Sequence, residues 1–163
     1  MDFAIKEEAR DWFKGIRQDL VALSGERVRS SPDFDAFYFC FVAGLAKKRK
    51  IEASKTIPIT ENFPGPYSER GRLLIALFLI YELEYLGIRM NEKKTVHDKI
   101  SELVDPNTPN FLSDEGVREF NKFAHGGYEV LSEWFTEQPQ SLEVFLRTFN
   151  KKIREIQRSS EEI

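Results

Sequence analysis

The sequence predicts an all-α protein, a single-domain bundle of about six helices around a central hydrophobic helix over residues 68–86. Two observations lead to this prediction. Apolar residues recur at spacings of three and four along most of the chain, as on the buried face of an amphipathic helix. Within residues 73–81 the side chains are apolar on every side, as expected of a helix that others enclose. A length of 163 residues suits one helical domain over residues 1–163, with a core rich in the 14 phenylalanines.

The first part of the chain is expected to hold two helices. The first covers residues 2–23, and Gly25 follows it where a left-handed turn ends a helix. The second covers residues 33–46 and is apolar almost all round, so its period alone does not distinguish it from a buried strand. Its length favours a helix, as do the cations that follow from Lys47 to Lys50, because positive charge suits a helix C-terminus.

Residues 51–67 interrupt this pattern. They contain three prolines and a glycine, a composition that a helix does not tolerate. A connection of about 17 residues is long for a compact helical domain, and long ordered loops are often functional. We therefore expect an interaction loop here, with Phe63 and Tyr67 exposed for contact with a partner.

Four helices are expected after this loop. Ser68 is the predicted N-cap of the central helix, followed by helices over residues 91–105 and 113–134 and a last one from Pro139. The apolar stripe of residues 113–134 stays in phase through Gly126-Gly127, so we interpret it as one helix. Two glycines cost such a helix about 1 kcal/mol each. They predict a close helix crossing, or a notch through which a ligand or partner approaches.

The sequence lacks the motifs that mark catalytic and metal sites, including the P-loop, G-x-S-x-G and G-x-G-x-x-G. Cys40 lies in an apolar run and is expected to be buried. His125 and Glu129 have the spacing that can begin a metal site, but His97 is the only other histidine, so a surface His–Glu pair is expected. We expect no metal, no cofactor and no enzyme activity, an enzymatic pocket under the 51–67 loop near His125 being the weaker alternative.

A membrane location is not expected. The most apolar segment, residues 73–81, is far shorter than the roughly 20 residues of a spanning helix. The N-terminal residues are acidic and amphipathic, unlike a signal peptide. The sequence therefore predicts a cytoplasmic protein.

The net charge of −3 is unevenly distributed, because residues 26–72 carry +3 and the rest of the chain −6. Arginines in the first turn of a helix oppose its dipole, which is understandable if an external anion docks on the free backbone N–H groups there. The predicted anionic-partner site comprises Arg27, Arg29, Lys47, Lys48, Arg49, Lys50, Lys55, Tyr67, Ser68, Arg70 and Arg72.

The first functional hypothesis is a non-enzymatic interaction or accessory subunit that docks onto a larger assembly or onto itself. In size and helical class the chain resembles small all-α accessory subunits of bacterial assemblies, without a shared motif. The second hypothesis is an accessory nucleic-acid-binding protein using the basic band of residues 27–72. A pI of about 5.6 counts against this second hypothesis, because dedicated nucleic-acid binders are usually basic. The two differ in whether the basic residues gather on one face.

Overall fold

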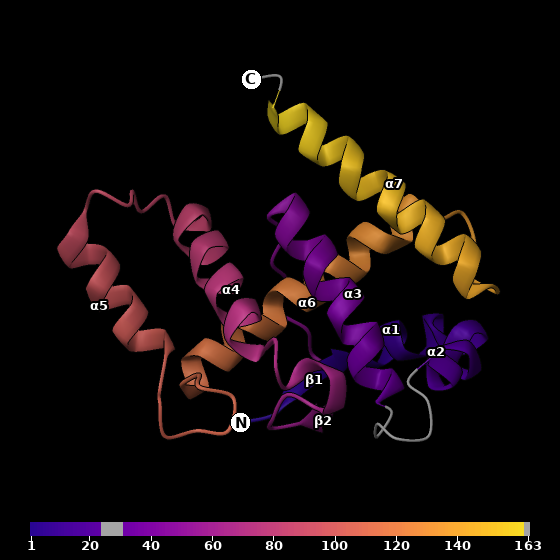
Figure 1. Ribbon diagram of the computed structural model, residues 1–163, viewed down its shortest axis with the longest axis horizontal. Helices are drawn as coiled ribbons and strands as arrows, with labels where there is room; N and C mark the ends of the chain where they lie inside the picture. The colour runs from indigo at the N-terminus through magenta and orange to yellow at the C-terminus, as the bar shows by residue number, and fades with distance from the viewer. Residues whose placement is uncertain (24–30, 162–163) are drawn as a thin grey trace.

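The computed structural model describes residues 1–23 and 31–161, and in these residues it confirms an all-α helical bundle (Figure 1). Two short strands are the β-structure that accompanies the helices there, β1 (Phe3–Lys6) and β2 (Thr56–Thr60). The α-helices are α1 (Glu7–Trp12), α2 (Arg17–Leu23), α3 (Pro32–Lys47), α4 (Gly71–Tyr85), α5 (Lys93–Leu103), α6 (Asp114–Trp134) and α7 (Leu142–Glu161). The predicted helix end at Gly25 lies outside the described residues.

The N-terminal segment differs from the single helix predicted over residues 2–23. It begins as β1, in which Phe3 and Ile5 are buried and their neighbours half-buried, the period of two that a strand produces. β1 pairs antiparallel with β2, and Ile5 lies opposite Ile57. The predicted interaction loop is therefore partly a strand, and it is tied to the N-terminus.

A second break in the predicted first helix separates α1 from α2. A short 3-10 helix, Lys14–Ile16, lies between them. A Cβ atom on Gly15 would come within 2.5 Å of the carbonyl oxygen of Pro139, so the chain approaches another backbone here. Only glycine leaves room for that approach, because any side chain would overlap the Pro139 carbonyl.

The centre of the bundle is the crossing of α3 and α6. A Cβ atom on Gly127 would lie 1.5 Å from the carbonyl oxygen of Cys40, and one on Gly44 would lie 1.9 Å from that of Phe123. The two backbones are therefore in direct contact. The close crossing predicted from Gly126-Gly127 is confirmed, and a helix backbone occupies the notch.

Phenylalanine rings fill the space beside this crossing. The rings of Phe41 and Phe120 stack with their centroids 3.9 Å apart. Phe37 and Phe78 approach the same ring of Phe120, at 6.0 and 5.2 Å. Rings from α3, α4 and α6 thus meet in one core, and stiff aromatic side chains fix its geometry.

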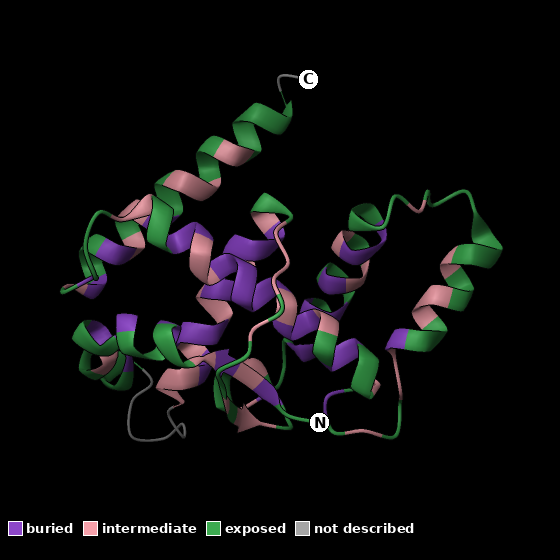
Figure 2. Ribbon diagram, turned by 180° about the vertical axis from the view of Figure 1, so that it is seen from behind, coloured by how far each residue is buried: buried purple, intermediate pink, exposed green. Residues whose placement is uncertain are grey.

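α4, the helix predicted at the centre, lies at the side of the α3–α6 pair. Its inner residues Leu74 and Phe78 are buried, but Leu73 is 59% and Ile80 46% exposed. Figure 2 shows the same alternation of buried and exposed surface along the helix. The predicted N-cap at Ser68 is wrong: α4 begins at Gly71 with Arg70 at the N-cap position and no side-chain cap, and the Ser68 hydroxyl donates to the Gly65 carbonyl.

The two ends of the bundle project from this centre (Figure 1). α4 and α5 form a helical hairpin on one side. α7 crosses near α3 on the other, and its C-terminal half extends beyond the remaining helices. None of the helices in the described ranges is both long and apolar enough to cross a membrane.

Candidate functional site

Two residues of the predicted anionic-partner site, Arg27 and Arg29, lie outside the described residues. Lys47 and Lys55 are exposed. The guanidinium of Arg72 lies over the ring of Phe111, with its carbon 5.6 Å from the ring centroid.

The cations after α3 contact carboxylates of the neighbouring helices. Lys48 lies 3.3 Å from Glu84 of α4, and Arg49 lies 2.8 Å from Glu133 of α6. Both pairs are on the surface. An external anion would have to displace these carboxylates, so the basic run connects helices within the molecule.

Lys50 forms the most enclosed of these contacts. Its Nζ lies 2.7 and 2.8 Å from the two carboxylate oxygens of Glu82 and also contacts Glu119. The side chains of Lys50 and Glu82 are only 7% and 1% exposed. Burial disfavours ionisation of Glu119, but hydrogen bonds from Lys50 and Lys122 outweigh it and lower the pKa of Glu119. This cluster joins the chain after α3 to α4 and α6.

The two aromatic residues of the predicted interaction loop are not both exposed. Phe63 is buried, and its ring lies 5.0 Å from that of Phe3. Exposure of Phe63 was therefore a wrong expectation, because β2 carries the loop onto the core. Tyr67 is half-buried, and its hydroxyl donates to Asp35. Burial first, and then the Asp35 carboxylate, raises the pKa of Tyr67.

His125 is buried and does not form the predicted surface pair with Glu129. It is 5% exposed, and its Nδ1 has no hydrogen-bond partner. Burial, with a smaller effect from Lys6, lowers the pKa of His125 to about 4. Glu129 lies 3.7 Å from Arg49 instead. Cys40 is buried as predicted, and within residues 1–23 and 31–161 no three His, Cys, Asp or Glu side chains gather as metal ligands would.

A groove of mixed apolar and polar lining runs between α3, α4 and α7. Its volume is about 720 Å³. Its floor and walls come from three helices, with Tyr38, Phe41, Val42 and Leu45 from α3, Leu74, Leu77 and Tyr81 from α4, and Ile153 and Ile156 from α7. Lys48 and Glu84, which pair with each other, lie at its rim.

A second hollow of about 410 Å³ extends this groove toward the start of α4. The two share Tyr38, Leu74 and Leu77, so they form one continuous surface, which we call the α3–α4–α7 groove. Tyr67 and Arg70 line its far end. With Lys48 at the other end, three residues of the predicted anionic-partner site thus line this groove.

The outer side of α4 continues the apolar surface of the groove. Leu73 and Ile80 are well exposed there, and Leu77 is partly exposed between them. Contiguous exposed apolar patches on soluble proteins usually mark sites of interaction. The sequence contained a signal for this groove, because residues 73–81 are more apolar than a helix with one buried side requires.

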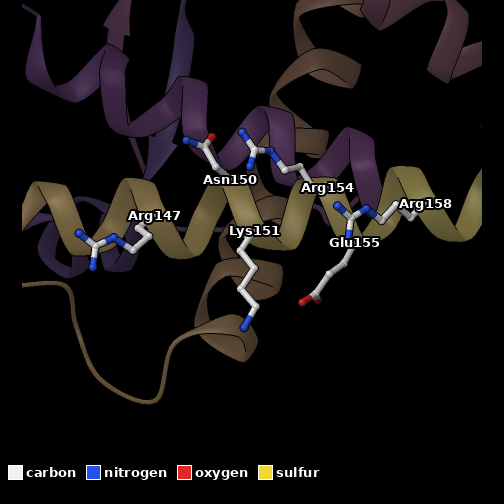
Figure 3. A pocket seen from close by; sticks show the side chains of 6 residues that line it. All are labelled: Arg147, Asn150, Lys151, Arg154, Glu155 and Arg158. Carbon is white, nitrogen blue, oxygen red and sulfur yellow. The ribbon is translucent and has the colours of Figure 1, made fainter.

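The sequence interpretation did not identify the outer surface of α7. Residues of this helix line a shallow depression of about 390 Å³ on its solvent side (Figure 3). Arg147, Lys151, Arg154 and Arg158 are among them. The detectable signal was their spacing of four, three and four residues, which places side chains on one face of a helix.

Comparison with known proteins found no matching family model, no similar curated protein and no similar solved structure.

Proposed function

We propose that this protein is a non-enzymatic accessory subunit of a larger cytoplasmic assembly, and that its α3–α4–α7 groove binds an amphipathic helix of a partner protein. The observation that carries the proposal is the exposed apolar side of α4 next to the groove. Leu73 and Ile80 extend into solvent there, where exposure of apolar surface has a cost of about 25 cal/mol per Å². A partner that covers them recovers this free energy.

The shape and chemistry of the groove favour a helix over an extended peptide. Strand addition needs a free sheet edge with backbone donors and acceptors, whereas this groove is lined by side chains of three helices. Apolar side chains that repeat at i, i+3 or i+4, and i+7 on a partner helix match a groove of this kind. The expected occupant is therefore an amphipathic helix.

The charged residues at the two ends of the groove are not equivalent. Lys48 and Glu84 at one end already pair with each other. Arg70 at the other end is exposed, and no ion pair joins it to any residue in the described part of the chain. A carboxylate on the partner helix would complement Arg70, so we expect an acidic residue at that end of the bound segment.

Two features favour protein docking over nucleic-acid binding through the basic residues 27–72. Nucleic-acid binding through residues 27–72 would need free cations, but Lys48, Arg49 and Lys50 are engaged with carboxylates. The groove lining mixes apolar side chains with polar ones, and the charged residues Lys48 and Glu84 already pair with each other, so it does not hold a free set of converging acids and bases as a catalytic pocket would. Both features support protein docking.

Site-specific photocrosslinking in native cells tests the proposal. A photoreactive amino acid at position 77 lies in the groove, and one at position 94 on the exposed face of α5 serves as the control. Position 77 is expected to crosslink to one segment that has an apolar stripe at helical spacing. Crosslinks to the same chain, or the same adducts from both positions, would contradict the proposal.

Binding of the purified partner then gives a quantitative check. Leu77→Asp places a charge on the groove wall and is expected to weaken binding at least tenfold. Lys94→Asp, on the opposite helix of the hairpin, is expected to leave the affinity unchanged. Circular dichroism of both variants confirms that they fold. Binding of Leu77→Asp with wild-type affinity would exclude the groove as the docking site.

A further inference from the structure

The solvent side of α7 carries a regular stripe of cations, which we call the α7 basic stripe. It consists of Arg147, Lys151, Arg154 and Arg158, and their spacing places all four on one face. At 1.5 Å per residue the stripe is about 16 Å long. Figure 3 shows these side chains extending from the helix around a shallow depression that Asn150 and one carboxylate, Glu155, also line.

Positive charge is concentrated in this part of the chain. Residues 145–158 contain five Lys and Arg and one carboxylate, a net charge of +4 in a chain whose total is −3. The single carboxylate, Glu155, lies 3.9 Å from Lys152 and so has a cation of its own. The remainder of the protein is correspondingly acidic, which makes the stripe a separate electrostatic surface.

Most of the stripe has no anionic partner within the protein. Arg147 pairs with Glu143 at 2.6 Å. Lys151, Arg154 and Arg158 form no ion pair with any residue in the ranges that the structure describes, and all three are exposed. Lys50, by contrast, has two carboxylates around it. The stripe thus offers cations that are free to bind an external anion.

We infer that the α7 basic stripe binds the phosphate backbone of a nucleic acid. A row of cations about 5 to 6 Å apart matches a polymer with regularly repeated charges better than a single small anion. Three of the four residues are arginines, whose planar guanidinium donates two parallel hydrogen bonds to a phosphate. Asn150 adds a neutral donor within the same depression. Contacts of this kind position a protein on nucleic acid without reading its sequence.

A lipid surface is a less suitable partner for this side of α7. A helix that lies in a membrane interface needs apolar residues free to enter the lipid. The apolar residues Ile153 and Ile156 of α7 line the α3–α4–α7 groove, and Val144 is the large apolar side chain that α7 exposes within the described residues. The α7 basic stripe is therefore expected to bind nucleic acid more tightly than anionic vesicles.

The stripe and the groove occupy different sides of the same helix. Groove residues Ile153 and Ile156 differ in direction from stripe residues Arg154 and Arg158 by about 100° to 160°, at about 100° per residue. A protein in the groove and a nucleic acid on the stripe do not compete for the same surface. The inference is therefore independent of the proposed function, and each can fail alone.

Fluorescence anisotropy with labelled duplex DNA, single-stranded DNA and duplex RNA of equal length tests the inference. The wild-type protein is expected to bind at low salt and to lose affinity steeply as KCl rises. The triple variant Lys151→Gln/Arg154→Gln/Arg158→Gln is expected to bind at least tenfold more weakly. Its log–log salt slope on duplex DNA should be shallower by about 2 to 3, since each phosphate contact contributes about 0.9.

A matched triple variant removes the same charge elsewhere. Arg89→Gln/Lys93→Gln/Lys94→Gln changes exposed cations on and before α5 and is expected to keep the wild-type slope. Equal losses in both triples would overturn the assignment, since only net charge would then matter. Absence of binding by the wild type at low salt would also overturn it, and so would tighter binding to polyglutamate or to phosphatidylserine vesicles than to any of the three nucleic acids.

Discussion

Gly127→Ala is the sharpest perturbation of the α3–α6 crossing. The added methyl carbon would lie 1.5 Å from the carbonyl oxygen of Cys40, and 2.8 Å from the backbone nitrogen of Gly44. Real Cβ contacts are hardly ever shorter than 3.0 Å, so the backbones must separate by about 1.5 Å. Neither atom is at the end of a flexible side chain, so no rotamer change relieves the overlap.

The cost follows from the aromatic core beside the crossing. A gap of even 0.5–1 Å loses about a quarter to a half of the dispersion attraction across it, and the Phe41–Phe120 stack bridges these two helices at 3.9 Å. Overpacking in rigid cores usually costs about 1–3 kcal/mol, and an overlap between two backbones belongs at or above the upper end. Alanine recovers about 1 kcal/mol of helix propensity. We expect a net loss of about 2–4 kcal/mol in the free energy of unfolding.

Urea denaturation followed by circular dichroism and tryptophan fluorescence measures this loss. Gly87→Ala is the matched control, because Gly87 has a positive φ of 72° but no atom within 4 Å of its Cβ position. That substitution costs only the backbone strain, about 1–2 kcal/mol. Helix propensity alone predicts that Gly127→Ala stabilises the protein. A variant as stable as the wild type would therefore refute the described contact between the two helices.

Three further perturbations test other parts of the structure. Lys50→Met leaves the buried Glu82 carboxylate unpaired and is expected to cost about 3–5 kcal/mol in urea denaturation, whereas Lys48→Met at an exposed pair should cost less than about 1 kcal/mol; equal losses would contradict the burial of the Lys50 cluster. The pKa of His125 is lowered to about 4 in the folded protein, whereas in the unfolded chain it is near 6.5. Because the unfolded chain takes up the proton first as the pH falls, the free energy of unfolding is expected to decrease by about 3 kcal/mol between pH 6.5 and 4. Stability measured across this pH range should be flatter in His125→Gln, and an unchanged pH dependence would refute this role. Tyr67→Phe removes the hydroxyl that donates to Asp35 and is expected to lower the free energy of unfolding by about 1–2 kcal/mol, measured by urea denaturation. A variant as stable as the wild type would contradict this hydrogen bond.

The helices that the sequence predicted well are those with local signals. α6 shows this most clearly, since Ser113 accepts a hydrogen bond from the backbone N–H of Gly116 as an N-cap should. Its apolar stripe runs through Gly126-Gly127 as expected. Each of these features depends on residues close in the chain, so a single sequence contains them.

The features that were mispredicted depend on distant residues. β1 is a strand because it pairs with β2, and the two are separated by about 50 residues in the chain. α4 is apolar all round, but composition does not say which of its sides the rest of the protein covers. Leu73 is exposed because α3 and α6, rather than α4, occupy the centre of the bundle.

The contrast between Lys47–Lys50 and the α7 basic stripe shows that cations close together in the sequence need not lie on one surface. Consecutive residues point in different directions, so neighbouring cations reach different helices, as Lys48 reaches α4 and Arg49 reaches α6. Four cations spaced by three and four residues point the same way on a helix and can face one extended ligand. Helical spacing, rather than the density of charge along the chain, therefore decides whether neighbouring cations form one surface in this fold.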